Sequence, residues 1–360
     1  MLFDWTSVNA RLQCVETSLQ LARTVLIRCR AFPSPWNMGL QRNWFRPLKY
    51  LGCCVLVYYV IQQMLNQPCL MDTNFLRSYP KFTGDARVPP DVTVVTAFFN
   101  LGNFKKGKDA VFGPTLYLEW AAVYKHLMNP LVVYTDSDQF VRLFTDMRQH
   151  LMNITKIIKI EKNQLWAFDH LDKVRDIYSD PNYPKYQPNT VVPEYPCVQN
   201  AKYACVEKAI ESDVFHTKYY MWLDVGYFRL ITGRKRNFRL TLPRDFDEKK
   251  IAINKVTRYS LDELPEDIFK KQYVWVGGGL VVAERGVFRQ FVKEYRRAVE
   301  HYLDLKLSNS DQQVLFAMYS KAEVRLKPTV QLQPYSSHWY GDCWFYLGYL
   351  CYGELLHFWE

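Results

Sequence analysis

The sequence has few glycines, 15 in 360 residues, and it lacks the glycine-rich signatures of two large nucleotide-binding classes. No G-x-G-x-x-G opens a helix and no P-loop is present, so nucleotide-binding motifs of these two types are absent. A C-x-x-C…C-x-x-C pattern, zinc-finger spacing and an RNP-type motif are absent as well. The net charge of +10 favours anionic partners. Without such motifs, however, the sequence does not predict nucleic-acid binding.

Charge is also missing from one long stretch, Tyr50–Met71. An uncharged segment of about 20 residues can span a bilayer. Basic residues precede this segment and Asp72 follows it, so the positive-inside rule places the N-terminal side in the cytosol. We therefore predict a single-pass type II membrane protein, and a buried core helix of a soluble domain is the alternative. The predicted parts are a cytosolic tail at 1–49, the membrane segment at 50–71, a proline-containing stem at 72–90 and a lumenal domain at 91–360.

A lumenal domain would meet an oxidising environment and the glycosylation machinery. Asn153-Ile154-Thr155 is a glycosylation sequon that could be used only there. The local disulfide pairings would be Cys197 with Cys205 and Cys343 with Cys351, which leaves Cys69 over. Connectivity does not follow from the sequence, so the pairing stays open.

The residues from 91 onward have the composition and the pattern of a globular α/β domain. The whole chain is 49% hydrophobic, and its aromatic content of 16% suits a packed core with further rings exposed in a cleft. Strand-like and helix-like segments alternate, which is typical of a parallel sheet flanked by helices. We expect strands at Val92–Phe99, Pro130–Tyr134, Ile154–Ile160, Tyr219–Phe228, Ile251–Val256 and Tyr273–Ala283. We expect helices at Pro114–Leu127, Phe140–Leu151, Gln199–Glu211, Gly286–Asp304 and Asp311–Tyr319.

One stretch of this domain, Tyr219–Arg229, carries an acid at the end of a very apolar strand. Its sequence YYMWLDVGYFR predicts a strand buried on both faces that leads into Asp224. A buried carboxylate is unfavourable unless it has a cation, a hydrogen-bond donor or a metal as partner. Ligands of open α/β sheets bind outside the carboxyl ends of the strands. Asp224 is therefore our first candidate for a site residue, and an acid that caps a turn is the alternative.

The loops that follow the predicted strands carry charge. Lys105 follows the first strand, Asp136 follows the second, and the basic segment Gly233–Arg239 follows the central strand. Basic loops at one edge of a parallel sheet suit a diphosphate, and an acid suits ribose hydroxyls or the edge of a base. Solvated surface loops are the alternative interpretation. The proline-rich stretch Tyr178–Pro196 predicts either a lid or acceptor-binding loop or a surface insertion.

Three further features could have either a structural or a functional role. The glycines Gly277, Gly278 and Gly279 would let a backbone approach a ligand closely. Asp311 opens a predicted helix, where it is either an N-terminal cap or a catalytic or acceptor-binding carboxylate. His338 lies in the aromatic segment SSHWYGD and is either a structural residue or a metal ligand.

The order of the motifs resembles a known family. The segments VVTAFFN, LEW, LVVYTD, YYMWLDVGYFR, VWVGGGL, SDQQ and HWYGD together resemble the HtrL/YibB-like glycosyltransferase family over about Asp91–Gly353. More broadly they look like a GT-A fold, a Rossmann-like, mostly parallel sheet flanked by helices. The resemblance implies an enzyme that transfers a sugar from a nucleotide-diphosphate donor to a glycan, protein or lipid acceptor. It also implies a location in the Golgi or ER.

The resemblance assigns roles to individual positions. It implies that Asp224 is the first acid of a D-x-D motif that holds Mn²⁺ or Mg²⁺ on the diphosphate. Gly226 stands in place of the second acid, so such a metal would need another ligand, for which His338 is the candidate. The nucleobase is expected to contact Thr96, Phe98 and Asn100, and Asp136 is expected to contact the nucleobase or the ribose. The sugar or the acceptor is expected at Gly277–Gly279. Asp311 would contact the acceptor or act as the catalytic base.

A non-catalytic function is the alternative. The missing second carboxylate at Gly226 favours a membrane-tethered GT-A-like domain that binds glycans or a partner enzyme. The glycine-rich segment, the basic loops and the region around Asp311 favour an intact enzyme.

Overall fold

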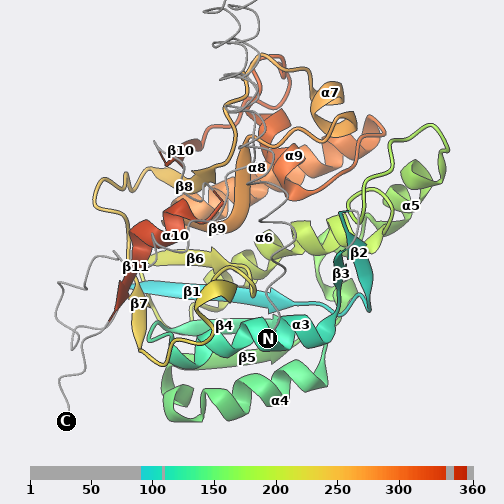
Figure 1. Cartoon of the computed structure of the whole chain (residues 1–360). Coiled ribbons are helices and arrows are strands. Elements are labelled where there is room, and N and C mark those ends of the chain that lie inside the picture. The colour runs from blue at the N-terminus through green and yellow to red at the C-terminus, as the bar shows by residue number, and fades with distance from the viewer. Residues whose placement is uncertain (1–90, 108–109, 338–343, 355–360) are drawn as a thin grey trace, which may run out of the picture. The chain divides into compact units, whose positions relative to one another are not determined.

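A seven-stranded sheet forms the centre of the structure, with strand order β10-β8-β9-β6-β1-β4-β5 (Figure 1). The structure is a computed structural model and describes residues 91–107, 110–337 and 344–354. The strands are β1 (Val92–Phe98), β4 (Leu131–Thr135), β5 (Thr155–Lys159), β6 (Tyr219–Leu223), β8 (Lys250–Lys255), β9 (Val276–Glu284) and β10 (Gln331–Tyr335). Only β9 runs antiparallel to its neighbours, β6 and β8, and the other pairs are parallel. The α/β class with a mostly parallel sheet is thus confirmed.

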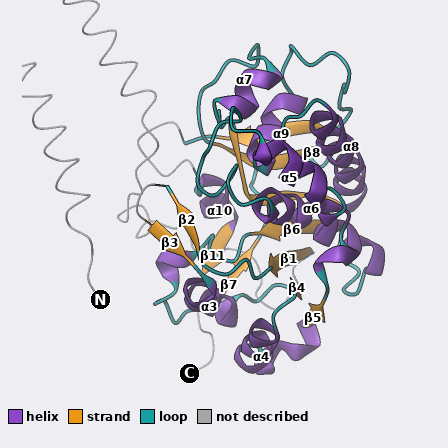
Figure 2. Ribbon diagram, turned by 90° about the vertical axis from the view of Figure 1, so that its right-hand side faces the viewer, coloured by secondary structure: helices purple, strands orange, loops and turns teal. Residues whose placement is uncertain are grey.

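Helices cover both faces of this sheet. They are α3 (Pro114–Ala121), α4 (Asp138–Met147), α5 (Leu171–Ser179), α6 (Glu194–Ser212), α7 (Pro265–Lys270), α8 (Arg285–Asp304), α9 (Asp311–Met318) and α10 (Tyr346–Cys351). One buried cluster contains residues of α6, α8 and α9, and a second contains residues of α3, α4 and α10. In the view of Figure 2 the sheet lies between α6 and α8 on one side and α3 and α10 on the other.

The central strands are buried on both faces because their side chains alternate between the two clusters. In β6, Tyr220 and Trp222 belong to the α6 side, whereas Met221 and Leu223 belong to the α3 side. All five residues of β6 are buried. The apolar run of the sequence therefore forms the doubly covered strand that its composition predicts.

Shorter elements complete the domain. Two small antiparallel sheets pair β2 (Phe104–Lys106) with β3 (Ala110–Phe112) and β7 (Phe238–Leu240) with β11 (Tyr352–Glu354). The 3₁₀ helices are η2 (Ala122–His126), η3 (Gln149–Ile154), η4 (Lys162–Gln164), η5 (Trp166–Phe168) and η6 (Arg229–Ile231). The predicted helix Pro114–Leu127 is therefore α3 followed by η2, and Phe140–Leu151 is divided between α4 and η3.

Two predicted boundaries need correction. The central strand ends at Leu223, because the chain then turns, with the Tyr227 amide donating to the Asp224 carbonyl at 2.9 Å. Helix α6 begins at Glu194, so it takes in the end of the proline-rich stretch. Proline is tolerated in the first turn of a helix because that turn has no intrahelical partner for its amide. Residues 180–193 of the stretch contain no helix or strand.

The suggested disulfide between Cys197 and Cys205 is wrong. Both residues lie on α6, and both are buried free thiols. Eight residues of α-helix separate their Cα atoms by about 12 Å, which is beyond the reach of a disulfide. Cys351 is likewise a buried free thiol, while Cys343 lies outside the described residues.

The predicted tail, membrane segment Tyr50–Met71 and stem lie outside the described residues. Within the part of the chain that the structure describes, no helix is both long and apolar enough to cross a bilayer. Asn153 of the sequon is exposed at the surface, in η3.

Candidate active site

A cavity of about 700 Å³ opens at the carboxyl ends of β1 and β6. The chain continues from β1 to β4 on one side of β1, while β6 pairs on the other side. In open α/β sheets this change of direction is where ligands bind. Phe98 from β1, Trp222 and Asp224 from β6 and the following turn, and Gly279 from β9 line the cavity. The fold thus brings Asp224 to the position that the apolar strand predicts for a site residue.

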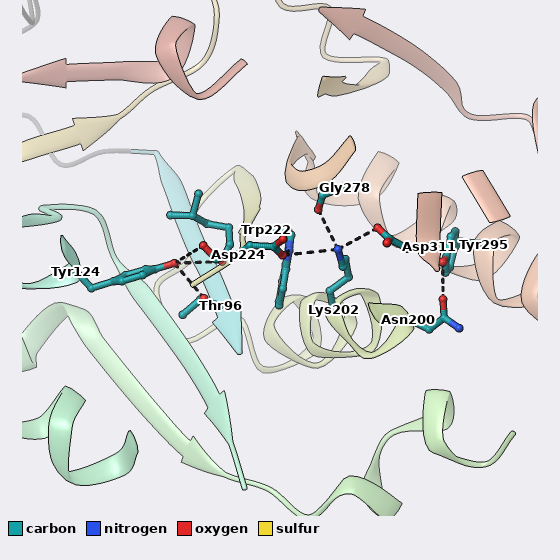
Figure 3. A network of polar contacts seen from close by, with 10 residues as sticks. Thr96, Tyr124, Asn200, Lys202, Trp222, Asp224, Gly278, Tyr295 and Asp311 are labelled. Carbon is teal, nitrogen blue, oxygen red and sulfur yellow. Dashed lines mark hydrogen bonds and ion pairs between the residues drawn. The ribbon is translucent and has the colours of Figure 1, made fainter. Parts of the chain in front are cut away.

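A buried lysine lies between two carboxylates at the wall of this cavity. Lys202 extends from α6 toward Asp224 on one side and Asp311 of α9 on the other (Figure 3). Its ammonium nitrogen is 2.9 Å from Asp311 Oδ2, 3.1 Å from the Gly278 carbonyl oxygen and 3.6 Å from Asp224 Oδ1. The Lys202 side chain is 3% exposed and Asp311 is 0% exposed, whereas Asp224 is 44% exposed. We refer to Lys202, Asp224 and Asp311 as the charged triad.

Burial and charge act on the triad in opposite directions. Burial by itself lowers the pKa of Lys202, but the Asp224 and Asp311 carboxylates outweigh it and raise that pKa above its ordinary value. Lys202 is therefore an ammonium at neutral pH. Burial raises the pKa of Asp311, and the Lys202 ammonium opposes this shift only in part.

Glycine makes the triad sterically feasible. A Cβ atom at position 278 would lie 2.0 Å from Asp311 Oδ2 and 3.3 Å from the Lys202 nitrogen. We expected these glycines to let a ligand approach the backbone closely. At Gly278 the group that approaches is the ion pair of Lys202 and Asp311. Of the three consecutive glycines, Gly279 lines the cavity, while Gly277 packs near Val256 and Trp344.

The turn after β6 is held from two sides. The indole nitrogen of Trp222 donates to Asp224 Oδ1 at 2.7 Å. The Tyr124 hydroxyl lies 3.2 Å from the Leu223 carbonyl oxygen and 3.1 Å from the hydroxyl of Thr96, which is fully buried. These contacts orient Asp224, which lines the cavity.

The cavity wall is aromatic and positively charged. The guanidinium carbon of Arg229 lies 5.6 Å from the ring centre of Trp120 and 4.7 Å from that of Phe345, within cation–π range. Lys106 lies 5.1 Å from the ring centre of Phe112. Among the described residues, those that line the cavity and carry charge are Lys106, Lys202, Arg229 and Asp224, a net charge of +2 (three positive, one negative). The buried Asp311 behind Lys202 offsets one of the positive charges. This charge suits an anionic ligand.

Asn100 and Asp136 form a contact of their own and do not line the cavity. The Asn100 amide donates to Asp136 Oδ1 at 2.9 Å. Lys162 lies 3.1 Å from Asp136 Oδ2 and donates to the Asn100 carbonyl at 2.7 Å. Asp136 therefore fixes the loop after β1, beside the predicted nucleotide site.

The other predicted site residues differ in where they lie relative to the cavity. Lys105 does not line the cavity, whereas its neighbour Lys106 does. None of the residues of Gly233–Arg239 lines it, because this segment leads into β7. Asp311 lies behind the wall, bonded to Lys202, and His338 lies outside the described residues.

Sequence reasoning missed Lys202, Trp120 and Arg229. A signal for Lys202 existed in the helix segment NAKYAC, where a single lysine stands among small and apolar residues. All six residues of this segment, Asn200–Cys205, are buried, and Lys202 is buried with them. A charge in that position requires an internal partner.

The described carboxylates near the cavity do not by themselves form a site for a divalent cation, the cofactor that a D-x-D motif would hold. A Cβ atom at position 226, where the second acid would stand, would lie 2.5 Å from a ring carbon of Trp120. Asp311 is bonded to an ammonium, and one oxygen of Asp224 faces the same ammonium and Trp222. No group of three or more His, Cys, Asp or Glu that could hold a metal occurs among the described residues.

The contact between Gly226 and Trp120 can be tested by stability. We expect Gly226→Ala to lower the free energy of unfolding by about 1–3 kcal/mol, because the added methyl overpacks the Trp120 ring. Gly233→Ala is the matched control, since nothing lies within 4 Å of a Cβ at that position. Urea unfolding measures both. In a Trp120→Ala background the effect of Gly226→Ala should largely vanish, and an undiminished effect there would contradict this contact.

Comparison with known proteins places the chain in a family. Mouse xyloside xylosyltransferase 1, in its apo form, has a TM-score of 0.34 and 10% identity, and 69% of this chain and 86% of that chain are covered. Core-mannan synthase A from Aspergillus fumigatus, in an Mn/GDP form, has a TM-score of 0.33 and 10% identity, with 68% and 73% covered. At these TM-scores neither structure carries an argument about function.

Two sequence comparisons are more direct. Protein HtrL of Escherichia coli (strain K12) is 23% identical over 243 residues, which cover 64% of this chain and 84% of HtrL. The family described as "Bacterial protein of unknown function (HtrL_YibB)" matches residues 90–327. The match spans β1 to β9, α3 to α9 and the charged triad, and the chain belongs to the HtrL_YibB family.

Proposed function

We propose that the chain is a glycosyltransferase that takes a sugar from a nucleoside-diphosphate donor. One observation carries the proposal, namely the cavity at the change of direction in the sheet. The described part of its lining combines a net charge of +2, one half-exposed carboxylate and several aromatic rings. This combination matches a ligand with an anionic centre, hydroxyl groups and flat faces, as in a nucleotide-sugar.

The proposed chemistry is substitution at the anomeric carbon of the sugar. The bond to the diphosphate oxygen breaks, an acceptor hydroxyl oxygen forms the new bond, and its proton passes to a base. The departing diphosphate gains negative charge, which Arg229 and Lys106 stabilise at the wall of the cavity. Asp224 is the only carboxylate among the described residues that line the cavity, so we assign the base to Asp224.

Asp311 has a positioning role in this proposal. We expected it to contact the acceptor or to serve as base. Its carboxylate is fully buried and bonded to Lys202, so it acts by holding the lysine beside Asp224. The acceptor, a hydroxyl on a glycan, protein or lipid, would enter through the open side of the cavity.

A ligand screen tests the proposal. We expect one member of a panel of UDP- and GDP-sugars, and its nucleoside diphosphate, to raise the melting temperature of the protein. A ligand at 100 times its Kd stabilises the folded state by about 2.7 kcal/mol, which is a shift of several degrees. If no member of the panel shifts the melting temperature, with manganese or without it, the proposal of a glycosyltransferase is contradicted. It would favour the alternative, a non-catalytic domain that binds glycans or a partner enzyme.

A substitution at Asp224 tests the assignment of the base. We expect Asp224→Asn to reduce the release of nucleoside diphosphate from the donor about 100-fold or more, since an amide cannot accept the proton. Asp172→Asn is the matched control, because Asp172 is 94% exposed on α5. Turnover is measured by coupled detection of the released diphosphate. Unchanged turnover in Asp224→Asn would show that another group is the base.

We further propose the type II membrane topology, with the domain in the lumen of the Golgi or ER. The uncharged stretch Tyr50–Met71 and its basic N-terminal flank support it. The exposure of Asn153 is consistent with a glycan at that position. Buried thiols at Cys197, Cys205 and Cys351 mean that the described cysteines need no disulfide in that compartment.

Glycosylation of Asn153 tests the topology. In eukaryotic cells we expect an N-glycosidase to reduce the mass of the full-length chain by one glycan. The substitution Asn153→Gln should abolish the shift, and Asn163→Gln, which alters an exposed asparagine outside any sequon, should not. A chain that is unmodified, and that protease digests in intact microsomes, would contradict the lumenal domain.

A further inference from the structure

The cavity presents a carboxylate where an anion is proposed to bind. Two like charges at close range repel each other, and the repulsion is stronger in a partly buried site than in water. Asp224, the proposed base, could therefore stay ionised beside a diphosphate only if a cation lies close to it. In a D-x-D site a divalent metal has this role, but position 226 lacks the second acid and the Trp120 ring fills the space.

The structure contains such a cation of its own. Lys202 is 3.6 Å from Asp224 Oδ1, and its remaining contacts to Asp311 and the Gly278 carbonyl fix it in place. The side chain is 3% exposed, so solvent does not screen the interaction as it would at the surface. An ammonium fixed at this distance acts on Asp224 whether or not a ligand is present.

A second positive charge lies at the same turn. Arg229 follows Asp224 by five residues, and one of its guanidinium nitrogens donates to the Gly226 carbonyl at 3.1 Å. The rings of Trp120 and Phe345 lie against the guanidinium. Trp120 therefore does two things at once, because it fills the space of a second carboxylate and supports a cation.

A metal on Asp224 would have to compete with these charges. A divalent cation binds a carboxylate oxygen at about 2.0–2.6 Å. With Lys202 already 3.6 Å from one oxygen of Asp224, the metal would lie close to the ammonium and be repelled by it. The arrangement is thus suited to an anion without a metal.

We propose that Lys202 and Arg229 together replace the divalent cation at Asp224, so that the site binds the diphosphate of its donor without a metal. The inference rests on the proposed function, since it concerns the same ligand. Asp311 enters it as the residue that holds Lys202, and Gly278 as the residue that leaves room for both.

Binding measurements with a chelator test this inference apart from catalysis. Calorimetry of the full-length chain with UDP, GDP, ADP and CDP should give, for at least one of them, a Kd in EDTA within twofold of the Kd in excess MnCl₂. If Mn²⁺ improves the affinity more than tenfold, or if binding requires it, the inference is overturned while the proposed function stands. If none of the four binds in either buffer, the proposed function fails and the inference fails with it.

A paired substitution tests the lysine itself. Lys202→Met combined with Asp311→Asn removes both buried charges, so that neither is left without its partner. We expect the folded double variant to bind the same diphosphate at least tenfold more weakly in EDTA, and to recover affinity in MnCl₂. Wild-type affinity of this variant in EDTA would overturn the role of Lys202.

The control for this pair is Lys173→Met with Asp304→Asn. These two residues form an ion pair of 2.7 Å with both side chains more than half exposed. The control variant should bind with wild-type affinity in both buffers. If the Lys202 variant does not fold, the EDTA measurement on the wild-type chain still decides the inference.

Discussion

The ion pair between Lys202 and Asp311 is the interaction on which the site depends. It joins α6 to α9, and through the Gly278 carbonyl it also reaches β9. Loss of one partner of a buried ion pair destabilises a protein by about 3–5 kcal/mol, because the other charge is left without compensation. The same lysine lies 3.6 Å from Asp224, so the contact that joins these elements also sets the charge at the cavity.

Two glycines near the ion pair leave space that larger side chains fill. Gly278 leaves the space that the Asp311 carboxylate occupies, and Gly226 leaves the space that the Trp120 ring occupies. Close packing means that neither position accepts even a methyl group without movement of its neighbours. The absence of a second carboxylate after Asp224 is therefore coupled to the presence of Trp120. Trp120 in turn lies against Arg229, so the glycine at position 226 is linked by packing to two further residues.

Much of the fold could be predicted because its signals are local. The apolar run of β6 and the alternation of strands and helices depend on neighbouring residues. Most predicted strands and the long helix α8 are found close to their expected bounds, and the main exception is the C-terminal end of β6. The structure of the proline-rich stretch was harder to predict, because its end forms the first turn of α6, where proline is allowed. The pairing of β2 with β3 was missed because strands of three residues carry too little periodicity.

The sequence by itself determined the α/β class, the family and the place of Asp224 at the end of a buried strand. Only the tertiary structure decided what surrounds that acid. Lys202 and Asp311 are 109 residues apart, and no periodic pattern connects them. Asp136 is bonded to Asn100 and Lys162, although its position after a strand suited a ligand equally well. The physical reason is that a strand is specified by its own side chains, whereas a site is assembled from the ends of several elements whose packing brings distant charges together.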